Sequence, residues 1–518
     1  MRPSRRDCIR ALGTFAGVAA TAYPQAGRTA AGTLTIAVQD NPPLLDPLRL
    51  TTNVAFRVAE NVYDNLIRID HSTGRLSPAL ATAWRQTSPF TWEIDLRSGV
   101  RFHDGTEMTA EDAAFSFGPQ RMRTTGLPSQ GVSRQFFSTI DAVEPVSRHT
   151  LRIVLTGPDP LFEHRLAGWG AQIICKAAFE RSGDWDRWGL MPIATGPYRV
   201  EAVRTGEFIR LVAHDDYWGG RPPYRSLTFR VLPEGAARLS ALAAGDVHVM
   251  TEVAPDQIAE IRSVAGLDVV GGAVNNIRVL NFGTLGGPLA DVRLRRALSL
   301  AIDRELLVQA LLGGLVQIPA GYQWPAYGDM FVADFPQPRH DPALARHLLQ
   351  QLGYAGQPIE YRVMPAYYTA ELSTAQALQQ MWADVGLNVN LKIVENWQAV
   401  FSQPNNAIFN GSINMVYPDA MGSLFLLYGK HGFIRHQARS WKSDRFDAIC
   451  DALLQTEAPA ERSALHREIL QIFAEEDPPG MILHEAGMFY GVRKDSGWQP
   501  QRSPAMNFGP FNPGLRNI

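Results

Sequence analysis

The stretch "FTWEIDLRSGVRFHDGTEMTAEDAAFSF" (Phe90–Phe117) carries the signals of a strand, a turn and a helix in succession. Apolar and polar residues alternate at its start, which predicts a half-buried strand whose apolar face consists of Phe90, Trp92, Ile94 and Leu96. The pair Asp104-Gly105 predicts a turn, because glycine adopts positive φ without steric cost. Since "LTFRVL" and "IEYRVM" also form short apolar runs between helical stretches, the sequence predicts an α/β fold.

The helix of this stretch is predicted to begin after Thr109, a good N-cap, with Asp112 three residues later completing a capping box. The same stretch offers a set of side chains that also suits a metal cluster or an acid/base centre: His103, Asp104, Glu107, Glu111 and Asp112. A strand-turn-helix path spreads these side chains apart, and acids in the first turn of a helix are favoured by its dipole. We therefore interpret them as turn and cap residues.

Composition sets the broad class. The chain has 518 residues, enough for two or three domains around a large core, and 45% of them are hydrophobic and 19% charged, as in soluble globular proteins. The formal net charge of −2 gives no sign of nucleic-acid binding.

The N-terminus predicts export. The pair Arg5-Arg6 precedes a weakly apolar run, residues 11–22, that ends in the small residues "ATA", so we expect a twin-arginine type signal peptide over residues 1–22. The alternative is an amphipathic terminal helix. Of the cysteines, Cys8 would be lost with the signal, and Cys175 and Cys450 are expected to be buried thiols rather than a disulfide.

A second helix is predicted in "DVRLRRALSLAIDRELL" (Asp291–Leu307), with Asp291 as its cap. Apolar residues recur there at i, i+3 and i+4 spacing: Leu294, Ala297, Leu298, Ala301 and Ile302. The arginines between them are expected to form a mostly solvated face: Arg293, Arg295, Arg296 and Arg304.

Motifs of enzyme chemistry are not visible: the sequence contains no G-x-S-x-G, H-E-x-x-H, P-loop or C-x-x-C pattern. His431 and His436 in "HGFIRH" offer two imidazoles to a metal. Five residues apart, they share a helix face poorly, so we favour surface histidines in a loop.

Several segments together resemble the extracytoplasmic solute-binding proteins of the peptide/oligopeptide/nickel class, family 5, which serve ATP-driven importers. In chain order they include "LLDPL", "LSPALATAWRQ", "ATGPYRVEAV", "ALAAGDVHVM" and "DVRLRRALSLAIDRELL". The resemblance implies a two-lobed periplasmic-binding-protein type 2 fold, with an extra subdomain in lobe I, that closes around its ligand. It places lobe I at 33–56, 165–272 and 484–518, the subdomain at 57–164, and lobe II at 273–483.

The same resemblance implies where the ligand is bound. Asp419 matches the acid that peptide-binding members place against the ligand's ammonium group, and Trp397 matches an aromatic residue of the cleft. The alternatives are a turn-forming Asp419 and a core Trp397. Where dipeptide binders carry an arginine for the ligand's carboxylate, this sequence has Tyr367 and Tyr368, which suit a less charged ligand. Tyr417, beside Asp419 in "YPDAMG", completes the ligand-binding candidates.

The predicted function is that of a periplasmic binding protein, without cofactor or catalytic residues, that delivers a peptide-like or other small polar solute to the permease subunits of an ATP-driven importer. We expect a monomer that binds no nucleic acid. Two alternatives stay open: a nickel-type metal-chelate binder using His431 or His436, and a secreted enzyme with an unrecognised site.

Overall fold

A computed structural model of the chain describes residues 32–49, 52–71, 73–124, 126–127, 129–365 and 367–515, so the predicted signal peptide and Cys8 lie outside the described residues. Its main element is one ten-stranded sheet. The strands lie in the order β14 (Val389–Ile393), β13 (Ile359–Val363), β15 (Ile408–Asn414), β12 (Leu267–Phe282), β16 (Gly480–Arg493), β11 (Val249–Met250), β1 (Thr33–Val38), β10 (Ser226–Val231), β9 (Phe208–Ala213) and β8 (Tyr198–Arg204).

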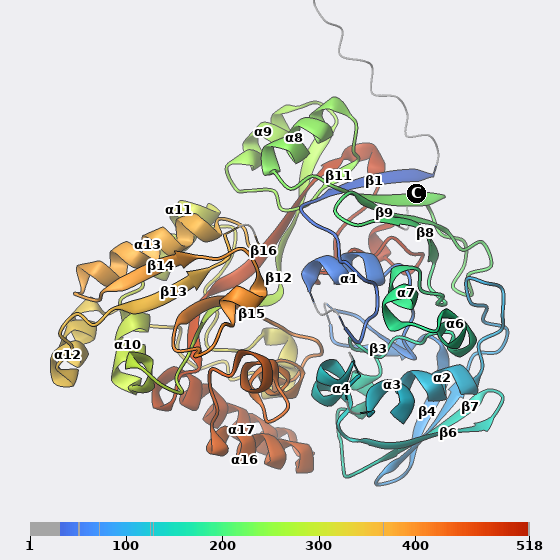
Figure 1. Ribbon diagram of the computed structural model, residues 1–518, viewed down its shortest axis with the longest axis horizontal. Coiled ribbons are helices and arrows are strands. Elements are labelled where there is room, and N and C mark those ends of the chain that lie inside the picture. The colour runs from blue at the N-terminus through green and yellow to red at the C-terminus, as the bar shows by residue number, and fades with distance from the viewer. Residues whose placement is uncertain are drawn as a thin grey trace, which may run out of the picture.

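The two long antiparallel strands β12 and β16 run through both lobes of the molecule and join them (Figure 1). We call the part around β1 and β8–β11 lobe I, and the part around β13–β15 lobe II. The pairing of β12 with β16 is interrupted between Ala273 and Ile277, which locally breaks the ladder between the lobes. The predicted lobe boundaries, 272/273 and 483/484, fall within these two strands; the boundaries themselves stay a prediction.

Helices cover both lobes. In lobe II they are α10 (Val292–Leu300), α11 (Arg304–Leu312), α12 (Pro342–Leu352), α13 (Glu371–Asp384), α14 (Trp397–Val400), α15 (Leu424–Tyr428), α16 (Asp444–Gln455) and α17 (Pro459–Gln471). In lobe I they are α1 (Asn53–Ala59), α2 (Ala110–Phe117), α3 (Pro119–Met122), α4 (Gln130–Phe137), α5 (Phe162–Arg165), α6 (Lys176–Ser182), α7 (Trp185–Leu190), α8 (Gly235–Ala244) and α9 (Gln257–Ser263). The mixed architecture confirms the α/β prediction.

A separate four-stranded sheet belongs to lobe I, on the right of Figure 1, with the order β4 (Ala81–Ser88), β5 (Thr91–Leu96), β7 (Thr150–Leu155) and β6 (Ile140–Ser147). A short pair, β2 (Ile67–Ile69) and β3 (Leu76–Pro78), lies nearby. The predicted strand of the opening stretch is β5, with Ile94 and Leu96 buried. Phe90 departs from the prediction: it lies in the turn before β5 and is 45% exposed.

The capping box is confirmed: the backbone N–H of Thr109 donates to the Asp112 carboxylate at 3.0 Å, and the Thr109 side chain accepts at the start of α2. Asp112 also accepts from the N–H of Lys176, at the first residue of α6. The other members of the stretch have structural partners too: His103 with Gly196, Asp104 with Arg181, and Glu107 with Arg148. Within the described residues no group of three potential ligands could hold a metal ion.

The arginine-rich helix is corrected in one respect. Asp291 caps α10 as predicted, and the apolar face is buried. Arg295 and Arg304, however, are only 4% and 3% exposed. Arg304 begins a second helix, α11, and donates to the carbonyls of Ile482, Ser299 and Ile302. These guanidinium groups satisfy carbonyls at the ends of packed segments, and sequence periodicity does not reveal such a role.

Cys175 and Cys450 are free, buried thiols, as predicted. No helix among the described residues is long and apolar enough to cross a membrane.

Candidate functional site

The two lobes touch each other along the side of the junction strands. Asn275 of β12 donates to the carbonyl of His71 at 2.7 Å. Gly74 lies against Pro418 so closely that a Cβ there would come within 2.6 Å of the proline ring, and its φ of +73° also requires glycine. The structure therefore has its lobes in contact.

A cavity of about 40 Å³ lies at this junction, lined by residues of both lobes. Lobe I contributes Asn53 and Glu252, and lobe II contributes the segment Tyr367, Tyr368 and Thr369. Arg278 of β12 and His484 of β16 also line it. A volume of this size holds a few waters, at roughly 10–15 Å³ each, and no dipeptide. A larger solute therefore needs the lobes to move apart.

Three of the predicted site residues form one aromatic group beside this cavity. The rings of Tyr367 and Trp397 meet edge to face at 5.0 Å, and Tyr367 and Tyr368 do so at 4.7 Å. Trp397 is the first residue of α14, where Asn396 caps the helix, and it stacks on Phe401 at 5.5 Å. All three predicted residues are half-buried. Part of each ring is therefore accessible to a solute, while the contacts between the rings hold them in place.

Tyr368 rests on a buried ion pair. The guanidinium of Arg278 lies 3.3 Å from the centre of the Tyr368 ring, and Arg278 also pairs with Glu371. The Tyr368 hydroxyl donates to Ser412 at 3.2 Å. Burial raises the pKa of this phenol, so it remains a neutral donor. These contacts fix the orientation of the ring.

Asp419 and Tyr417 lie in a different, more enclosed environment. Asp419 is 4% exposed, and both of its carboxylate oxygens already have partners: the N–H of Met421 at 2.8 Å and the guanidinium of Arg462 at 2.6 Å. Tyr417 is buried, donates to the carbonyl of Met421 at 3.3 Å, and lies beside Arg165. Burial raises the pKa of the Tyr417 phenol. The charge of Asp419 is therefore balanced by Arg462, and that of Arg165 by Asp159.

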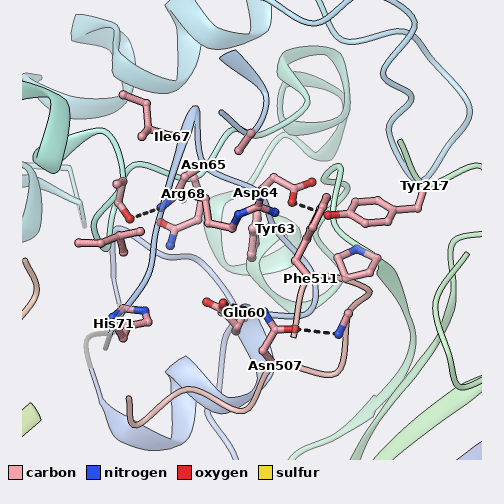
Figure 2. A pocket seen from close by; sticks show the side chains of 17 residues that line it. Glu60, Tyr63, Asp64, Asn65, Ile67, Arg68, His71, Tyr217, Asn507 and Phe511 are labelled. Carbon is pink, nitrogen blue, oxygen red and sulfur yellow. Dashed lines mark hydrogen bonds between the residues drawn. The ribbon is translucent and has the colours of Figure 1, made fainter. Parts of the chain in front are cut away.

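A second cavity, of about 90 Å³, lies inside lobe I between α1, β2 and the C-terminal segment (Figure 2). Asp64 accepts there from Tyr217, Trp218 and Thr195 at 2.8, 2.9 and 3.0 Å. Glu60 accepts from the side-chain amide of Asn507 at 3.2 Å, and burial raises its pKa to about 7. The two carboxylates thus join the segment that follows α1 to distant parts of the chain.

Comparison with known proteins decides the family. Residues 75–433 match the family described as "Bacterial extracellular solute-binding proteins, family 5 Middle", over more than half of the chain. The chain belongs to this family. The solute-binding protein is 24% identical to the dipeptide-binding protein of Escherichia coli over 92% of its own length and 94% of the relative's.

Two solved structures resemble this solute-binding protein in fold. A dipeptide-binding protein from Pseudoalteromonas sp. SM9913 in complex with Met-Leu has a TM-score of 0.84 at 22% identity, covering 92% of this chain and 98% of that one. NikA from Staphylococcus aureus in complex with Ni(L-His)2 has a TM-score of 0.80 at 18% identity, covering 92% and 98%. These likenesses confirm the predicted two-lobed fold.

The histidines weighed as metal ligands do not converge in this solute-binding protein. The rings of His431 and His436 are nearly parallel, with centroids 6.4 Å apart, and His436 bonds to the carbonyl of Lys430 at 2.6 Å. Burial lowers the pKa of His431.

Sequence reasoning missed the charged residues that support the candidate site: Arg57, Glu252, Arg278, Glu371 and Arg462. Each pairs with a partner far away in the chain, for example Arg57 with Glu252 and Arg278 with Glu371. No local pattern marks such pairs. The one available signal was that Glu252 closely follows "ALAAGDVHVM", a segment already matched to the family.

Proposed function

We propose that this protein holds a peptide-like or other small polar solute between its lobes and delivers it to the membrane permease subunits of an ATP-driven importer. The observation that carries the proposal is the aromatic group of Tyr367, Tyr368 and Trp397 at the junction where lobe II meets Asn53 and Glu252 of lobe I. Sites of this kind enclose small ligands with apolar walls and a few fixed polar groups. Relatives named as dipeptide-binding proteins support this ligand class.

In this proposal the aromatic group supplies most of the contact area. Trp397 and Tyr367 stack on apolar or planar parts of the solute, and Tyr368 offers a neutral hydroxyl and ring held in place by Arg278. The protein catalyses no reaction and requires no cofactor.

Asp419 and Tyr417 are proposed as further ligand contacts, reached when the lobes open. A cationic group of the solute that approached Asp419 would share the carboxylate with Arg462. The charge of Asp419 is already balanced by Arg462. Tyr367 and Tyr368 stand where dipeptide binders carry an arginine for the ligand's carboxylate, so we propose a solute of low net charge. Nickel chelates are the second candidate, supported by the likeness to NikA.

We further propose that the chain acts outside the cytoplasm as a monomer, after export by the twin-arginine route. Replacing Arg5-Arg6 by Lys-Lys is then expected to leave the precursor in the cytoplasm. Normal periplasmic yield of that variant contradicts this route of export and leaves the ligand proposal untouched.

Native mass spectrometry of the protein purified from a periplasmic extract tests the ligand proposal. We expect a mass increment that is lost on denaturation and that fragments as a short peptide or a small polar molecule. A nickel isotope pattern in that increment contradicts the peptide proposal and favours the chelate. Conversion of the released compound by the protein contradicts a pure binding function.

A further inference from the structure

One hydrogen bond crosses the lobe junction beside the aromatic group. The hydroxyl of Thr369, in lobe II, donates to the carboxylate of Glu252, in lobe I, at 3.2 Å. Glu252 lies two residues after the end of β11, and Thr369 immediately follows Tyr368. The two residues are 117 positions apart in the chain. Because they belong to different lobes, their hydrogen bond requires the lobes to be together.

Glu252 is held in place by its own lobe. Its other oxygen pairs with the guanidinium of Arg57, a side chain of α1 that is 1% exposed. Arg57 also donates to Gln39 at 2.7 Å, and Gln39 accepts from Thr251 at 3.1 Å. These bonds all lie within lobe I, and they hold the Glu252 carboxylate facing Thr369 of lobe II.

The backbone on both sides of the contact adopts an unusual conformation. Glu252 has a φ of 55°, and Ala370, next to Thr369, has a φ of 54°. Residues with a Cβ seldom occupy this left-handed region, and such conformations concentrate at functional sites where surrounding contacts hold them.

The same segment of lobe II carries the aromatic group. Tyr367 lines the junction cavity together with Asn53 of lobe I, and its ring packs against Trp397 of lobe II. Tyr368 is fixed on Arg278 within lobe II. Thr369 therefore lies on a short segment that contacts lobe I and also carries Tyr367 and Tyr368, which together with Trp397 form the proposed ligand wall.

We infer that Thr369 and Glu252 form a closing latch, in which their hydrogen bond stabilises the closed lobes and holds Tyr367 in position against the solute. The inference rests on the proposed function, because it assigns these two residues to the closure of the same site. They act as positioning residues: they couple closure to the ligand wall and need not touch the solute. Loss of the bond shifts every closed complex toward the open state by the same factor, whatever the solute.

The test measures lobe closure in the absence of any solute. Dyes are attached to the exposed substitutions Glu207→Cys in lobe I and Gln350→Cys in lobe II, and single-molecule energy transfer gives the ratio of closed to open molecules. Thr369→Val keeps the shape of the side chain but removes the hydroxyl, whereas Thr369→Ser keeps the hydroxyl. Thr205→Val, in the exposed turn between β8 and β9, is the matched control.

We expect Thr369→Val to lower the closed-to-open ratio about tenfold, which corresponds to about 1.4 kcal/mol, while Thr369→Ser and Thr205→Val resemble the parent. The latch is contradicted if Thr369→Val has the same closed-to-open ratio as the parent. This includes the case in which both proteins are fully open.

A second arm keeps the latch separate from the proposed function. The dipeptide Met-Leu is added as a probe to the parent and to Thr369→Val. If the probe and the solute released from the purified protein both fail to close the parent, the proposed function fails, and the solute-free ratios still decide the latch. If a probe closes both proteins with equal affinity, the latch is contradicted although the proposed function stands.

Discussion

Arg462 of α17 donates to the carboxylate of Asp419 at 2.6 Å, in a buried pair that joins the turn after β15 to the helical layer of lobe II. Arg462 also donates to the carbonyls of Leu453 and Thr456, at the end of α16. The residue predicted to meet a ligand's ammonium group is thus also part of the structure of its lobe. A substitution at Asp419 is therefore expected to change the stability of lobe II as well as the affinity for the solute.

Breaking this pair from the arginine side is expected to destabilise the protein. Arg462→Met leaves Asp419 buried without its charge partner, which costs about 3–5 kcal/mol. Denaturant unfolding measures the loss. Arg467→Met is the control on the same helix, because Arg467 is exposed and pairs with an exposed Asp334, a type of contact worth about 0–1 kcal/mol. Equal effects of the two substitutions contradict the importance of the buried pair.

Trp397→Ala is expected to weaken solute binding by roughly 1–3 kcal/mol through lost packing, with little dependence on salt. Calorimetry with the solute identified from the purified protein measures the change. Trp185→Ala, which removes a half-buried tryptophan of α7 packed against Phe179, serves as the control and should leave affinity unaltered. Unchanged affinity in Trp397→Ala removes this residue from the proposed ligand wall.

The capping box at the start of α2 is expected to act on stability alone. Thr109→Ala and Asp112→Ala should each cost roughly 0.5–2 kcal/mol, with Asp112→Ala the larger because it also loses the bond from the N–H of Lys176. Thermal unfolding and solute titration are measured on the same samples. Loss of solute binding at an unchanged melting temperature would contradict the purely structural interpretation of Thr109 and Asp112.

Glu60 gives the stability a specific pH dependence. Its folded pKa of about 7 exceeds its ordinary value of 4.5, so between these values the folded state binds more protons than the unfolded state. The contribution of Glu60 to stability therefore falls as pH rises from about 4.5 to about 7, by up to roughly 3 kcal/mol. Glu60→Gln is expected to remove this slope, whereas Glu207→Gln, at an exposed position, should keep it. Parallel pH profiles of the parent and Glu60→Gln contradict the buried-acid assignment.

Local signals in the sequence predicted the helix caps correctly. Thr109 and Asp291 cap helices because each acts on N–H groups two or three residues away. Arg295 and Arg304 were misjudged because their partners, near Pro478 and Ile482, are brought to them only by the fold. Glu252 and Thr369 were missed for the same reason. Chain periodicity reports which face of an element is apolar, and it carries no information on pairs formed between lobes.

Small-angle scattering of the purified protein, with its solute removed and then restored, tests most directly the claim that a solute is held between the lobes. We predict that restoring the identified solute decreases the radius of gyration, because a ligand that touches both lobes favours the closed state by its extra contacts there. Trp397→Ala should require a higher solute concentration to reach the same compact state. Tight binding with no change in the radius of gyration at saturation would contradict the account.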